Sequence, residues 1–345
     1  MNKKLLLSTA LASVALTGSA LAELSISANT EVTLRSLAYD QTSNDTGGVA
    51  GTALGQETNI SIKGGKDLDN GMSLAMGGNV EMDNKENGSG MREVSMVASN
   101  DSMFIGYGRD HGVGVDLDGS VAPHVGDQND TLSQGSDAFS SAYMDVHSSD
   151  HLKLGFNLLG GTLAVAYAPN FGSQEADSGT PTGGDSAYSV GYQGNLGIEG
   201  LSVQAGYSES DTAANSATVG DKEYSKIGVA YNFGQFAVGG DIQDYGVTTT
   251  ATGTVANGAQ ATRINATFAA SDNLAIGISH TETEESLGSG ATGYATQKEE
   301  EITAITVGYN IAGMGFNFSY AETENLGGAN GVDTTSWQIQ TKQSF

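Results

Sequence analysis

The sequence predicts an all-β protein, a closed antiparallel barrel of about sixteen strands that spans a membrane. Three observations support this fold class. From residue 24 onward, apolar residues recur at every second position, which is the period of a strand with two different faces. Long and short connections alternate along the whole chain. Seven apolar rows end in a tyrosine.

The first 22 residues have the order of a secretory signal peptide. Lys3 and Lys4 precede a run of leucines and small apolar residues, which ends at Ala20-Leu21-Ala22. We therefore expect residues 1–22 to be a signal peptide cleaved during export and residues 23–345 to form one barrel domain. The alternative, a buried N-terminal helix, has no amphipathic pattern to support it.

Composition excludes several classes of protein. The 345 residues include 49 glycines and no cysteine, which excludes a disulfide scaffold, a Cys-ligated metal site and a cysteine nucleophile. No segment after the leader has the ~18 consecutive apolar residues of a membrane-spanning helix. Acidic residues number 40 against 14 Lys and Arg, so the net charge is −26 and a duplex nucleic-acid partner is excluded.

The alternation places the strands in order along the chain. We predict strands at 24–39, 55–63, 71–83, 91–98, 102–108, 142–158, 162–168, 186–194, 201–208, 223–231, 235–243, 261–269, 274–281, 301–309, 314–321 and 334–345. The weakest is 142–158, because its pattern breaks at Ser148-Ser149-Asp150. Sixteen strands make a barrel wide enough for an aqueous channel, and closure leaves no bare sheet edge in the lipid.

The connections indicate that the two ends of the barrel face different environments. The long ones fall at 40–54, 84–90, 109–141, 169–185, 209–222, 244–260, 282–298 and 322–333, with short turns between them. Long external loops and short periplasmic turns are typical of a membrane barrel. The loop at 109–141 is the longest.

The tyrosines that end the apolar rows predict two aromatic belts. Tyr107, Tyr167, Tyr207 and Tyr320 would lie at the long-loop end, and Tyr192, Tyr231 and Tyr309 at the turn end. Tyrosine settles at the boundary between lipid and water. Ordinary β-propensity explains one or two such cases, but it explains seven poorly.

Short motifs resemble the general diffusion porins of Gram-negative bacteria. The last strand ends in Phe345, residues 106–116 (GYGRDHGVGVD) resemble the end of strand five and the start of loop three, and residues 123–127 (PHVGD) resemble a shortened turn in that loop. The resemblance implies an outer-membrane homotrimer in contact with outer-membrane lipids. It also implies that loop 109–141 folds into the lumen as the constriction loop, with its acids facing a basic wall.

The resemblance and the strand alternation together suggest which residues form the constriction. Arg109 matches a basic wall position of the family, whereas Glu31, Asn59 and the region of His147 stand where that family is basic. Alternation points Arg35, Lys63 and Arg263 inward, either as a rearranged basic wall or as ordinary solvated lumen charges. The predicted constriction residues are Arg109, Asp116, Asp118, His124, Asp127, Asp130, Arg35 and Arg263.

Cofactor and enzyme motifs are few. Asp116, Asp118 and Asp127 share one loop, where either a calcium ion or plain solvation fits the carboxylates. The five histidines show no spacing suited to a metal-binding helix, and no hydrolase, phosphate-loop or zinc-protease motif occurs. We therefore expect no enzymatic activity and no other cofactor.

These features predict an outer-membrane pore for the passive diffusion of small hydrophilic solutes and ions. We expect a modest cation preference, because the chain without the leader has a net charge of −28 and its basic wall is thinned at Glu31, Asn59 and His147. Arg35, Arg109 and Arg263 act in the opposite direction. A pore selective for a sugar or phosphate is an alternative, and a sugar pore would need inward aromatic residues, with Phe104 and Trp337 as the test positions. An outer-membrane enzyme or adhesin is the third class, with His280 near Glu282 and His111 near Asp110 as its only candidate pairs.

Overall fold

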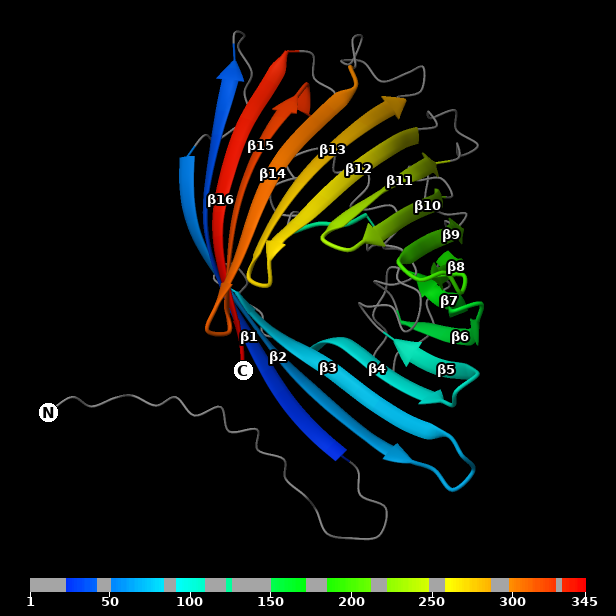
Figure 1. Cartoon of the computed structure of the whole chain (residues 1–345). Coiled ribbons are helices and arrows are strands. Elements are labelled where there is room, and N and C mark those ends of the chain that lie inside the picture. The colour runs from blue at the N-terminus through cyan, green and yellow to red at the C-terminus, as the bar shows by residue number, and fades with distance from the viewer. Residues whose placement is uncertain are drawn as a thin grey trace, which may run out of the picture.

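A computed structural model shows one closed antiparallel β-barrel (Figure 1). It describes residues 23–41, 51–83, 91–108, 122–125, 150–171, 185–211, 222–247, 258–286, 298–326 and 331–345. Every element within these ranges is a strand. None of the described residues belongs to a helix of the length and apolar character needed to cross a membrane.

The strands are numbered in chain order. They are β1 (Glu23–Gln41), β2 (Gly51–Asp67), β3 (Ser73–Asp83), β4 (Met91–Ser99), β5 (Met103–Gly108), β6 (His151–Leu158), β7 (Gly161–Phe171), β8 (Asp185–Gly194), β9 (Leu201–Asp211), β10 (Lys222–Phe233), β11 (Phe236–Val247), β12 (Gly258–Ser271), β13 (Leu274–Ser286), β14 (Glu300–Ile311), β15 (Met314–Glu324) and β16 (Val332–Ser344).

Each strand pairs with the next, and β1 pairs with β16 to close the ring. This last ladder runs from Asn29 opposite Ser344 to Gln41 opposite Val332. Phe345 extends it by one step, because its N–H donates to the carbonyl of Ala28 at 2.7 Å and its carbonyl accepts from the N–H of Ala28 at 3.2 Å. Closure gives the backbone of both terminal strands a partner, as a hydrocarbon environment requires.

The sixteen strands occur in the predicted order, and the main difference is their length at the long-loop end. β9, β13 and β15 continue to Asp211, Ser286 and Glu324, three to five residues past the predicted ends. The apolar alternation stops earlier because acidic and polar residues follow it, while the hydrogen-bonded ladder continues. The predicted strand 142–158 begins at His151, and residues 142–149 lie outside the described ranges.

The two faces of the wall are the reverse of those of a soluble protein. Outward positions are large, apolar and exposed, such as Ile227 at 56%, whereas inward positions are polar and buried, such as Gln204 at 0%. Among the predicted belt residues, Tyr167, Tyr231 and Tyr309 are outward and about half exposed. An apolar outer band of this kind is suited to contact with lipid, and the polar inner face is suited to contact with water.

Candidate functional site

The inner face of the barrel carries charges of both signs. At described inward positions these are Glu31, Arg35, Glu57, Lys63, Lys153, Lys226, Asp241, Arg263, Glu300 and Lys342. Their inward direction follows from the alternation of side chains along each strand. Cross-strand partners point to the same face, and the residues next to these charges in sequence are the exposed apolar residues of the outer face. The lumen is therefore lined by a mixed-charge polar wall.

One side of this wall is covered and the other is open. From β6 to β16 many inward side chains are buried, and Lys153 and Lys226 are only 2% and 4% exposed. On β1 and β2, the inward Arg35, Glu57 and Lys63 are half-buried or exposed. Solvent therefore reaches the lumen wall chiefly along β1 and β2.

Residues 122–125, here called the internal segment, lie inside the barrel. Ala122 and Val125 are 1% and 7% exposed. A Cβ atom placed on Gly308, an inward residue of β14, would lie 2.7 Å from Cγ1 of Val125, so Val125 occupies space that only a glycine leaves free. The segment is the short teal trace within the ring of strands in Figure 1. This part of the predicted constriction loop thus reaches the wall opposite its own strand.

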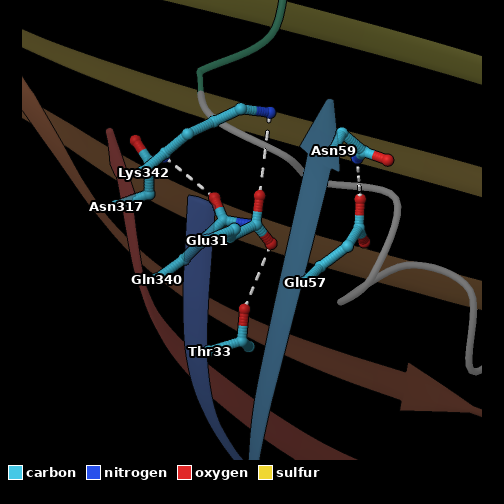
Figure 2. A network of polar contacts seen from close by, with 7 residues as sticks. All are labelled: Glu31, Thr33, Glu57, Asn59, Asn317, Gln340 and Lys342. Atoms are coloured by element: carbon cyan, nitrogen blue, oxygen red, sulfur yellow. Dashed lines mark hydrogen bonds and ion pairs between the residues drawn. The ribbon is translucent and has the colours of Figure 1, made fainter. Parts of the chain in front are cut away.

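A polar network lies at the seam where the buried inner face of β16 meets the more open inner face of β1 and β2 (Figure 2). Glu31 is 9% exposed, and its Oε1 accepts from Nε2 of Gln340 at 2.6 Å and from Oγ1 of Thr33 at 3.2 Å. Nζ of Lys342 lies 3.7 Å from Oε2 of Glu31. The seam therefore holds a buried carboxylate that an amide, a hydroxyl and an ammonium group stabilise together.

A second carboxylate lies directly beside this network. Glu57 on β2 is the cross-strand partner of Glu31, and it accepts a hydrogen bond from Nδ2 of Asn59 (Figure 2). Like charges at directly opposed positions repel each other, since their Cβ atoms are about 5 Å apart. Lys342 is the ammonium group that offsets part of this repulsion.

The covered side has its own network. The hydroxyl of Tyr224 donates to Oε1 of Gln243 at 3.1 Å, and Nε2 of Gln243 donates to Oδ1 of Asp241 at 2.6 Å. Asp241 is the cross-strand partner of Arg263, whose Nε is buried without a hydrogen-bond partner. This cluster is buried in the wall of β10–β12 and presents little charge to water.

The predicted constriction residues fall into two groups. Arg35 and Arg263 both lie inward and are half-buried, and His124 is the exposed residue of the internal segment. The other five lie outside the described residues, so their role stays a prediction: Arg109, Asp116, Asp118, Asp127 and Asp130. The sequence analysis missed Glu57 and Lys342, although counting by twos from Asn59 and Gln340 would have placed both on the inner face.

The alternative functions gain little support. Trp337 faces outward, as cross-strand partner of Ser36 and Tyr320. Phe104 faces inward with its ring over Gly155, where a Cβ atom would clash with it. Nε2 of His280 lies 3.1 Å from Oε1 of Glu282, but both side chains are on the outer face. No group of three or more His, Asp or Glu side chains in the described ranges is arranged to hold a metal ion, and the predicted calcium ligands lie outside those ranges.

Part of the acidic excess lies on the outer rim instead of in the lumen. Glu301 has Glu282 and Glu324 as its cross-strand partners, which makes a row of three outward carboxylates at the long-loop end. Desolvation, followed by the charges of Glu282, Glu284 and Glu301, raises the pKa of the nearby Glu299. The net charge of the chain is therefore a poor guide to the charge of the channel.

Comparison with known proteins identifies relatives of this architecture. A family model described as Gram-negative porin matches residues 8–339. No curated protein matches the chain. OmpT, an outer membrane protein of Vibrio cholerae, shares 12% identity at a TM-score of 0.62 over 94% of this chain and 98% of that one. A variant of the Rhodopseudomonas blastica porin shares 13% identity at a TM-score of 0.59 over 93% of this chain and 100% of that one. At these identities the two structures support the fold alone.

Proposed function

Because the chain belongs to the Gram-negative porin family, we propose that it forms a water-filled pore through which small hydrophilic solutes and ions diffuse passively. Family membership makes it an outer-membrane channel and not an enzyme. The observation that carries the proposal is the polar inner wall, which solvent reaches along β1 and β2. The internal segment lies against this wall and narrows the lumen.

General diffusion fits this wall better than a pore selective for a sugar. Among the described inward positions the aromatic residues are Phe104, Tyr224 and Tyr245, and Tyr224 is 1% exposed. A sugar pathway requires a continuous series of accessible rings, since each pyranose stacks on one. The described wall has no such series.

A phosphate-selective pore would need several accessible cations close together. Lys63 is the partner of Ser25, ten residues along β1 from Arg35, which separates the two by about 33 Å at 3.3 Å per residue. Lys342 is engaged with Glu31. Among the side chains that the structure describes, the accessible cations are therefore spread along the wall and do not form an anion site.

We expect the pore to prefer cations modestly. Glu31 and Glu57 lie side by side on the open wall, and the constriction-loop acids Asp116, Asp118, Asp127 and Asp130 would add to them. Arg35 and Lys342 act in the opposite direction. The reversal potential in a KCl gradient tests this, and a sign that shows chloride preference would contradict it.

A homotrimer is part of the proposal, and a polar patch on the outer face supports it. Thr30 and Thr58 share a hydrogen bond of 3.1 Å, and Nε2 of Gln56 donates to Thr58 at 3.3 Å. These residues are outward, near the middle of β1 and β2, where lipid offers no hydrogen bonds. A neighbouring copy would cover them. We also propose that export removes residues 1–22, so that the mature chain begins at Glu23, which intact mass measurement checks.

The decisive experiment is single-channel recording from the refolded protein in a planar bilayer, with polyethylene glycols of graded size as probes. We expect stepwise conductance that small polymers reduce and large polymers leave unchanged. A correctly folded barrel without conductance would refute the proposed function. Saturation of the conductance by one sugar or by phosphate would favour a selective pore.

A further inference from the structure

A row of inward residues connects the internal segment to the carboxylate of Glu31. Val125 lies against Gly308, whose cross-strand partner is Asn317. Nδ2 of Asn317 donates to Oε1 of Gln340 at 3.0 Å, and Nε2 of Gln340 donates to Glu31 at 2.6 Å. The network at the β16–β1 seam is therefore connected, by steps between neighbouring strands, to the place where the internal segment lies against the wall. A charge on this inner wall faces the solutes that pass through the lumen.

Two carboxylates of this wall, those of Glu31 and Glu57, lie on directly opposed positions of β1 and β2, but they differ in environment. Glu31 is 9% exposed and has Lys342 and Gln340 as partners. Glu57 is more exposed, and its hydrogen bond comes from a neutral amide, that of Asn59. Among the described residues no Lys, Arg or His forms an ion pair with Glu57.

We infer that Glu57 is the residue that sets the cation preference of the pore, and that Lys342 limits this preference by neutralising Glu31. The inference rests on the proposed function. Among the described side chains of this row, two carboxylates and one ammonium group leave one net negative charge, which Glu57 presents to the lumen. The next position of the row, on β3, is another acidic residue, Asp83. A passing cation is attracted by the carboxylates of Glu57 and Glu31 and offsets their mutual repulsion, whereas a passing anion is repelled by both. The solutes whose passage this charge favours are small cations, including primary ammonium compounds that donate hydrogen bonds to a carboxylate.

The absence of cysteine from the chain allows a direct test. A Glu57→Cys variant can be modified in the open pore. One sample receives a reagent that adds a sulfonate to the thiol, and a separate sample receives a reagent that adds a trimethylammonium group. We expect the cysteine variant to lose about tenfold in the ratio of potassium to chloride permeability, because one charge about 6 Å away in water changes the permeability of each ion about threefold and in opposite directions. The sulfonate should restore the ratio, and the ammonium group should reduce it further.

Two further variants test whether the effect requires an inward position and whether Lys342 has the role assigned to it. Ile60→Cys is the matched control, because Ile60 lies three residues along β2 on the outer face, and both reagents should leave its permeability ratio unchanged. Lys342→Gln should raise the ratio, since Glu31 then loses its ammonium partner. Each variant should keep the gel mobility of a folded barrel.

The outcomes distinguish this inference from the proposed function. If the wild type forms no pore, the proposed function fails. If the wild type conducts but Glu57→Cys keeps the wild-type ratio and the sulfonate reagent changes nothing, the inference about Glu57 is wrong while the pore stands. A lower cation preference in Lys342→Gln would overturn the role assigned to Lys342.

Discussion

Replacement of Ile227 by lysine tests whether the apolar outer band faces lipid. Ile227 is in the middle of β10, outward and 56% exposed in the isolated barrel. A lysine at the bilayer midplane of a membrane barrel destabilises the fold by about 2–4 kcal/mol. That corresponds to a roughly 30- to 700-fold lower folding equilibrium constant. In water, by contrast, the same change would remove an exposed apolar side chain at little cost.

Ser225→Lys is the matched control, because Ser225 is on the same strand and face but closer to the long-loop end, opposite Tyr207. Near the interface the expected cost falls to about 0–1 kcal/mol. Guanidinium unfolding from lipid vesicles measures both variants through the single tryptophan, Trp337. Equal costs for the two variants, or no cost for Ile227→Lys, would refute a lipid-facing band at β10.

Three other predictions follow from the same structure. Unboiled protein should migrate differently from boiled protein on a detergent gel, and identical migration together with a helical infrared spectrum would exclude a barrel. Deletion of residues 116–130 should increase the conductance and the size cutoff, because it removes the internal segment; unchanged values would place this loop outside the lumen. Gly308→Val should alter the conductance by displacing Val125, whereas Gly315→Ala, whose Cβ would meet neighbours at 3.4 and 3.7 Å, should leave it unchanged.

The strand order was predictable because a barrel wall repeats one local rule. Each strand alternates an apolar and a polar face, and this requires no knowledge of distant contacts. The strand ends were less predictable. At Glu209 and Glu322 the outward residue is acidic, yet the ladder continues and the hydroxyls of Tyr207 and Tyr320 donate to these carboxylates. An acidic residue at an outward position therefore marks the end of the lipid band and not the end of the strand.

The candidate site was predictable only in part, because its contacts join the two ends of the chain. Glu31 is 309 positions away from Gln340, its hydrogen-bond partner. Alternation placed Arg35 and Arg263 on the same inner face, but it could not show which parts of that face are covered. Coverage depends on what lies across the lumen, as Val125 does at Gly308.

The position of each charge, more than the sum of the charges, should govern the selectivity of this pore. The outward row of Glu282, Glu301 and Glu324 contributes to the net charge of −26, yet it faces the rim, where salt screens it within a Debye length of about 8 Å. Glu57 lies on the inner wall, where the low-dielectric barrel excludes part of the counter-ion atmosphere and focuses the field. Added salt should therefore weaken the influence of the rim sooner than that of Glu57. A cation preference that persists at high salt would have its origin in the lumen.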